Sequence, residues 1–196
     1  MPMLESAMED LLIRQLTCSV FPGGIPQWTY RTDLRTEDDL WQNLREKLNA
    51  ANIDRLQGVL LTDAEMAQVK DFICDQAQTT YKAARWLAGE HRVAQIPLTR
   101  EDAKLGTVSL VAVNSREIAG GNSVYEVINQ YRTPGDTGER DRRFDVTLLV
   151  NGLPVIHIEL KNADHPYMDA YRQIKKYGEE GKFRGLMGLV QMFVVT

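Results

Sequence analysis

RRFDVTLLVNGLPVIHIELK, residues 142–161, consists of two mostly apolar runs that flank an Asn-Gly pair. Asn-Gly between two such runs is a strong β-hairpin signal, because both residues tolerate the positive φ angles of a tight turn. The sequence therefore predicts two antiparallel strands, over 143–150 and 154–161.

Side chains alternate between the two faces of a strand, so this hairpin is expected to have an apolar face and a polar face. Asp145 on the first strand and Glu159 and Lys161 on the second are expected to meet on the polar face. The apolar face is expected to comprise Phe144, Val146, Leu148, Val150, Ile156, Ile158 and Leu160.

The turn sets the register of the hairpin. A plain two-residue loop at Asn151-Gly152 would place Asp145 and Glu159 on opposite faces. A three-residue loop with Gly152 in the left-handed conformation makes Asp145 face His157, with Glu159 as a diagonal neighbour about 7–8 Å away. We therefore predict an odd-length loop or a β-bulge in this hairpin.

Two carboxylates on one face suit a hard divalent cation such as Mg²⁺, which keeps several waters and binds phosphate oxygens. A lysine on the same face can position or activate a water molecule and offset charge in the transition state. Asp145, Glu159 and Lys161 therefore predict a site for phosphodiester hydrolysis. Glu-x-Lys alone is common on solvated strand faces, so the prediction depends on Asp145. We expect His157 beside the ligands rather than among them.

The rest of the chain reads as helices followed by strands. Apolar spacing predicts a helix over 4–16. A helical block is expected over 36–88, where Thr36 and a capping-box pattern at Thr62 mark helix starts. The expected strands are 105–113, 122–131, 143–150, 154–161 and 189–196, with one helix at about 166–180. A strand, helix, strand order at this length predicts a parallel crossover.

The composition is that of an ordinary globular protein of 196 residues, with 43% apolar and 26% charged residues. The 23 basic and 27 acidic side chains give a net charge of −4, which excludes a uniformly basic nucleic-acid coat protein. Two cysteines without metal-binding spacing favour a reduced, cytoplasmic location. The sequence contains neither a signal peptide nor an apolar run of about 18 residues, so no membrane partner is expected.

Asp145, followed about a dozen residues later by Glu159-Leu160-Lys161, resembles the PD-(D/E)xK pattern of restriction-endonuclease-like nucleases. NGLP at 151–154 followed by IELKN at 158–162 is similar, more specifically, to the amino-terminal nuclease domain of the R subunit of type I restriction enzymes. Phe144 departs from the proline in the name of the pattern, but that proline has no chemical role.

Two further segments resemble the same family. QIKKY at 173–177 resembles its Gln-x-x-x-Tyr motif, which is shared with RecB-like nucleases. Gln173 and Tyr177 share a helix face, although an ordinary amphipathic pair has the same spacing. MEDLLI at 8–13 resembles the opening helix of the family, whose glutamate contributes to the site. Glu9 matches that glutamate better than Glu5, and a solvated helix edge is the alternative for both.

The resemblance implies a role for each of these residues. Asp145 and Glu159 would bind Mg²⁺, with the Leu160 carbonyl as a possible third ligand. Lys161 would serve the attacking water. The motif pair Gln173 and Tyr177 would steady the site or the DNA.

The resemblance also implies a fold and a function. The fold would be a single α/β endonuclease domain over 1–196, with a restriction-endonuclease-like core ordered helix, three strands, helix, strand. A mostly helical insertion at about 28–100 would follow the first helix. The activity would be Mg²⁺-dependent cleavage of double-stranded DNA, with the methylation and specificity subunits as partners.

In the family an ATP-dependent motor follows this domain. The sequence contains no Gly-x-x-x-x-Gly-Lys-Ser/Thr loop, so any ATP chemistry would belong to a motor region absent from this chain. The strand pattern at 189–196 stops without a turn, and we expect a fragment of a longer chain.

Two alternatives stay open at this point. The first is another nuclease of the superfamily, RecB-like or junction-resolving, which a fused or co-encoded motor would argue against. The second is a degenerate, non-catalytic domain that docks DNA or a partner, which metal binding dependent on Asp145 would exclude.

Overall fold

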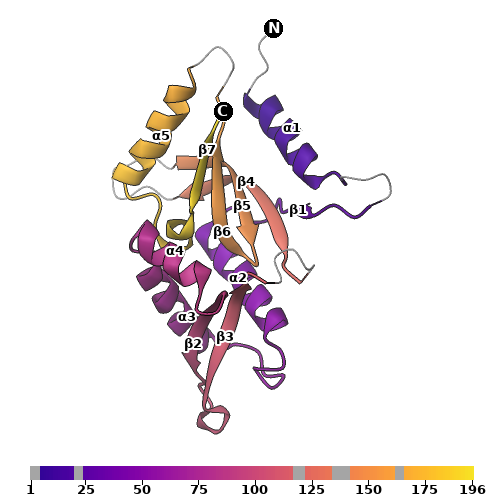
Figure 1. The fold of residues 1–196 in the computed structure, drawn as a ribbon, viewed down its shortest axis with the longest axis vertical. Helices are drawn as coiled ribbons and strands as arrows, with labels where there is room; N and C mark the ends of the chain where they lie inside the picture. The colour runs from indigo at the N-terminus through magenta and orange to yellow at the C-terminus, as the bar shows by residue number, and fades with distance from the viewer. Residues whose placement is uncertain (1–4, 20–23, 117–121, 134–141, 162–165) are drawn as a thin grey trace.

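The computed structural model describes residues 5–19, 24–116, 122–133, 142–161 and 166–196 (Figure 1). These residues form a mixed α/β fold, which confirms the α/β part of the predicted fold class. The predicted order of helix, three strands, helix and strand is present as α1, then β4, β5 and β6, then α5 and β7. The bounds of these elements are α1 Glu5–Thr17, β4 Tyr125–Thr133, β5 Arg142–Val150, β6 Leu153–Glu159, α5 Tyr167–Glu179 and β7 Met192–Val195.

The main sheet has five strands in the order β1-β4-β5-β6-β7. Its three central strands pair antiparallel, and the outer strands β1 and β7 pair parallel to β4 and β6. The parallel pairing of β6 with β7 through α5 confirms the predicted crossover. The edge strand β1, Trp28–Tyr30, was not predicted, because three residues are too few to show a period.

Two apolar clusters hold helices α1 and α5 against the sheet, and the two helices lie on opposite sides of it (Figure 1). Ile13 of α1 packs with Val127, Val146 and Ile158 in one cluster. Tyr177 of α5 belongs to the other cluster, which extends into the segment between α1 and β4. This arrangement brings residues of both helices to the strand ends where Asp145 and Glu159 lie.

The insertion after α1 contains the three helices α2 Glu37–Ala51, α3 Asp63–Gln76 and α4 Thr80–Ala88. Thr36 and Thr62 are the N-terminal caps that the sequence predicted, and both form capping boxes, although the sequence predicted a capping box only at Thr62. The prediction of helical structure in the insertion is wrong over β2, Val93–Thr99, where buried and exposed residues alternate with a period of two. The predicted strand at 105–113 is β3, Thr107–Asn114, and it pairs with β2 in a separate sheet rather than with the main sheet.

The β5–β6 hairpin combines a two-residue turn with a β-bulge. Val150 pairs with Leu153 across Asn151-Gly152, and both turn residues have positive φ, 53° and 80°. The register shifts between Leu148 and Leu149, so the predicted bulge is confirmed and the three-residue loop is wrong. Because the bulge moves the pairing by one position, Thr147 and not Asp145 faces His157.

The side-chain alternation slips once in β5, close to Asp145. Phe144 packs with Tyr131 and Tyr177 on the α5 side, whereas Val146 packs with the α1 cluster. The prediction that Phe144 and Val146 share a face is therefore wrong. Opposite this slip in β4 lies Gln130, between the pairs that flank Asp145, with a φ of 53°.

A buried charge network ties β4 to the insertion. The Glu126 carboxylate, 1% exposed, accepts hydrogen bonds from Arg31 Nη1 at 2.5 Å and Asn43 Nδ2 at 2.8 Å, and lies 3.0 Å from Lys47 Nζ. Arg31 also donates its backbone N–H to Val127 at 2.9 Å. These contacts hold the first part of β4, the strand that contains Asn129 and Gln130, against the insertion.

We expect Glu126→Ala to lower the free energy of unfolding by about 3 kcal/mol, because it leaves Lys47 and the buried Asn43 amide without their carboxylate, and leaves Arg31 only the exposed Asp33 carboxylate. Urea unfolding measures the change. The exposed Glu46→Ala on α2 is the matched control and should change the free energy by less than about 0.5 kcal/mol. Equal losses in the two variants would contradict the role of the network.

Candidate active site

A cavity of about 660 Å³ opens between α1, α5 and the ends of β4 and β5. Five predicted site residues line it: Glu9, Asp145, Lys161, Gln173 and Tyr177. The sixth, Glu159, is fully buried and contacts Lys161 and Gln173. The fold thus gathers at one place residues that are up to 168 positions apart in the sequence.

Asp145 is largely buried at the break in the β5 alternation. Its Oδ2 accepts a hydrogen bond of 2.8 Å from the Leu160 N–H, which anchors the end of β6 to β5. Burial, followed by the nearby charge of Glu159, raises the pKa of Asp145 to about 7. Lys161 and the Leu160 N–H oppose this rise, and Glu9 adds to it.

Glu159 is held by residues from both β6 and α5. Its Oε2 lies 3.2 Å from His157 Nε2, and its Oε1 accepts a hydrogen bond from the Gln173 amide. Lys161 Nζ lies 3.7 Å from the same Oε1. His157 is also fully buried, with Nδ1 3.3 Å from Thr147 Oγ1, so it contacts a predicted ligand as expected.

Gln173 and Tyr177 lie one turn apart on α5, and both side chains are directed to the site. Gln173 Nε2 donates to Glu159 and to the Tyr177 hydroxyl, the latter at 2.6 Å. The Tyr177 hydroxyl lies 3.5 Å from the Arg143 carbonyl oxygen. The two residues therefore connect α5 to both β5 and β6, an arrangement that a solvent-facing amphipathic pair would lack.

The first helix supplies two glutamates with different environments. Glu9 is buried, 6% exposed, and accepts hydrogen bonds from the amides of Asn129 and Gln130. Glu5 is more exposed and lies 3.9 Å from Lys161 Nζ. The buried position of Glu9 differs from the solvated helix edge that was its alternative.

Asn129 and Gln130 line the cavity and were not predicted as site residues. The available signal was a pair of consecutive amides within the otherwise apolar run Val127 to Tyr131. Strand periodicity assigns one of the two to each face, so it cannot predict that both contact Glu9.

The groups of the site that could bind a metal ion all do so through oxygen atoms. In the part of the chain that the structure describes, no three His, Cys, Asp or Glu side chains gather closely enough to hold a metal ion by themselves. The predicted set has two carboxylates, Asp145 and Glu159, and the Leu160 carbonyl. Such a partial set is compatible with Mg²⁺, which completes its coordination with water and substrate phosphate.

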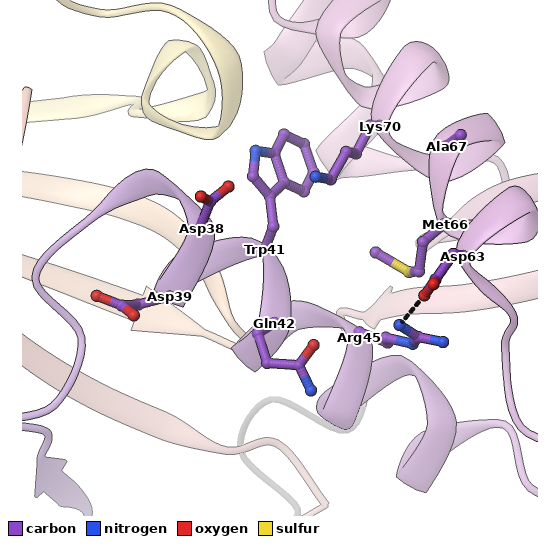
Figure 2. Close-up of a pocket in the computed structure, with 9 residues that line it drawn as sticks. All are labelled: Asp38, Asp39, Trp41, Gln42, Arg45, Asp63, Met66, Ala67 and Lys70. Carbon is purple, nitrogen blue, oxygen red and sulfur yellow. Dashed lines mark hydrogen bonds and ion pairs between the residues drawn. The ribbon is translucent and has the colours of Figure 1, made fainter. Parts of the chain in front are cut away.

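A second cavity, of about 500 Å³, lies between α2 and α3 and contains none of the predicted site residues. Figure 2 shows the Lys70 ammonium directed at the Trp41 ring, with 5.4 Å to the ring centroid, and Arg45 paired with Asp63 at 2.7 Å. Its main cationic groups are thus already engaged.

Among the helices that the structure describes, none is long and apolar enough to span a membrane.

The family model described as the type I restriction enzyme R protein N terminus matches residues 2–196. A type I restriction enzyme endonuclease subunit of Staphylococcus aureus strain MSSA476 is 30% identical over 166 residues, which are 85% of this chain and 16% of the relative. The corresponding subunit of Staphylococcus saprophyticus is 30% identical over 83% of this chain and 16% of its own length.

The EcoprrI endonuclease subunit of Escherichia coli is 25% identical over 87% of this chain and 59% of the relative. The chain thus spans about a sixth of the length of the staphylococcal relatives, and all three relatives are type I restriction enzyme endonuclease subunits. Because the family model covers nearly every residue, the chain belongs to the family of the type I restriction enzyme R protein N terminus.

Proposed function

We propose that this chain is the nuclease domain of a type I restriction enzyme R subunit and hydrolyses phosphodiester bonds of double-stranded DNA with Mg²⁺. One observation carries the proposal: Asp145, Lys161, Gln173 and Tyr177 line one cavity, and buried Glu159 contacts Lys161 and Gln173 there. The names of the relatives, which are endonuclease subunits, support it. We also infer that the core order from α1 to β7 is the restriction-endonuclease-like core.

The residues present fit a hard divalent cation. Asp145 Oδ1 has no hydrogen bond or ion pair among the described residues and belongs to a side chain that lines the cavity. The charges of Glu159 and Glu9 add to the negative potential at Asp145. Asp145, Glu159 and the Leu160 carbonyl would hold the ion, which supplies positive charge against the phosphate and its transition state.

The side chains around these ligands have separate tasks in the proposed reaction. Lys161, 3.7 Å from Glu159, orients the attacking water with its ammonium group and offsets the charge that develops on the phosphate. Gln173 fixes one oxygen of Glu159, and His157 fixes the other. Tyr177 sets the direction of the Gln173 amide through a hydrogen bond of 2.6 Å.

The remaining parts of the proposed enzyme lie outside this chain. We propose that a motor region elsewhere in the R subunit binds and hydrolyses ATP, and that the methylation and specificity subunits are the partners. In this scheme the cytoplasmic complex delivers DNA to the cavity between α1 and α5.

We expect Lys161→Ala, in an R subunit assembled with its partners, to lower the rate of DNA cleavage by at least about 100-fold, because the water loses its orienting cation. ATP hydrolysis by the same complex should be unchanged. Plasmid linearisation and phosphate release measure the two activities. Lys175→Ala is the matched control, since Lys175 lies on the exposed side of α5 and pairs with Glu179. Cleavage at the normal rate by Lys161→Ala would remove the proposed site.

We expect the Mg²⁺ affinity of the chain to fall by up to about tenfold per pH unit below pH 7, because the ion must displace the proton of Asp145. Titration calorimetry at pH 6, 7 and 8 measures it, and Asp145→Asn should bind Mg²⁺ weakly at every pH. A pH-independent affinity in the wild type would contradict the assignment of Asp145 as a ligand.

The stability of the metal-free protein should change with pH in the opposite sense. The pKa of Asp145 rises from 3.8 to about 7 on folding, so between these values the folded state retains a proton that the unfolded chain has lost. The free energy of unfolding therefore decreases as the pH rises through this window. Urea unfolding with EDTA should show this decrease in the wild type and a smaller one in Asp145→Asn.

A further inference from the structure

Two consecutive residues of β4 bind the same carboxylate of α1. Asn129 Nδ2 donates to Oε1 of Glu9, and Gln130 Nε2 donates to Oε2 at 2.7 Å. Successive side chains of a regular strand point to opposite faces of the sheet. A regular β4 would therefore direct only one of these amides at Glu9.

The backbone at Gln130 accounts for the second amide. Its φ of 53° lies in the left-handed region, which carries a steric cost for any residue with a Cβ atom. The conformation moves the alternation by one position, since Val127 packs on the α1 side and Tyr131 on the α5 side. The strained residue lies between the pairs Asn129–Val146 and Tyr131–Phe144, which flank Asp145 in β5.

Neighbouring residues fix the orientation of the Asn129 amide. Its Oδ1 accepts hydrogen bonds of 2.7 Å from the Tyr30 hydroxyl and from Arg35 Nη1. Only the Nδ2 group is left for Glu9. The direction of this donor is thus set by β1 and by the segment that leads into α2.

The partners of Glu9 hold its carboxylate without neutralising it. Glu9 is 6% exposed, and within the described residues its hydrogen-bond donors are two uncharged amides, with no ion pair. A buried carboxylate is costly unless a cation compensates it. Glu9 nevertheless lines the same cavity as Asp145 and is close enough to raise the Asp145 pKa.

We propose that Gln130 is a positioning residue whose left-handed backbone directs its amide to Glu9, so that the Glu9 carboxylate is held toward the cation bound at Asp145. The inference rests on the proposed metal-dependent function and extends the site to β4. The steric cost at Gln130 then serves the metal site rather than the stability of the fold.

The test is Gln130→Gly in the full chain, which relieves the backbone and removes the amide together. The expected result is a melting temperature equal to or above that of the wild type, with a Mg²⁺ affinity lowered by about tenfold in titration calorimetry, as for other residues that orient metal ligands. If Gln130 had a purely structural role, the substitution would lower the melting temperature together with the Mg²⁺ affinity.

Gln57→Gly is the matched control. Gln57 has the same φ of 53° but is exposed in the turn after α2. The same substitution there should leave the Mg²⁺ affinity unchanged. In a Glu9→Gln background, Gln130→Gly should produce no further loss of affinity, because Gln130 acts through Glu9.

An unchanged Mg²⁺ affinity in Gln130→Gly, with binding still abolished by Asp145→Asn, would overturn the role of Gln130 and leave the proposed function intact. A lower melting temperature together with a lower affinity would identify a structural role and also overturn the inference. Failure of Asp145→Asn to affect Mg²⁺ binding would overturn the proposed function and this inference with it.

Discussion

The carboxylates of Glu9 and Glu159 lie within electrostatic range of the Asp145 carboxylate at one partly buried site, and the rest of the site is arranged around the charge of these three groups. Burial, followed by the charges of Glu159 and Glu9, raises the pKa of Asp145, so ionisation of Asp145 is disfavoured in the absence of a cation. Each carboxylate accepts at least one hydrogen bond, from the Leu160 N–H, from Gln173 or from the amides of β4. Lys161 Nζ, 3.7 Å from Glu159 Oε1, offsets part of this negative charge.

The scaffold keeps these like charges together by holding α1 and α5 on opposite sides of one sheet. Apolar packing of Ile13 against Val146 fixes α1, and contact of the Tyr177 ring with the Phe144 ring, 5.2 Å between centroids, fixes α5. The insertion contributes as well, because Glu126 ties β4 to α2 and Arg35 orients Asn129. The insertion, which the sequence predicted as a mostly helical block, thus supports the site through its contacts with β4.

The sequence predicted most of the elements because their signals are local. The helix caps at Thr36 and Thr62, the turn at Asn151-Gly152 and the parallel crossover all depend on residues close together in the chain. The hairpin register was predicted only in part. A bulge was expected, but its combination with a two-residue turn was not, and so Thr147 rather than Asp145 faces His157.

The residue types at 145, 159 and 161, with their spacing, are enough to predict a carboxylate and lysine site, because strand periodicity is a property of the local backbone. Only the tertiary structure decided which face each residue occupies near Asp145, since the alternation slips where Gln130 adopts a left-handed conformation. At that slip Asn129 and Gln130 both donate to Glu9, across 120 and 121 positions of sequence. Periodicity within a strand carries no information about a partner that far away, so the support of Glu9 by β4 became apparent only in the folded chain.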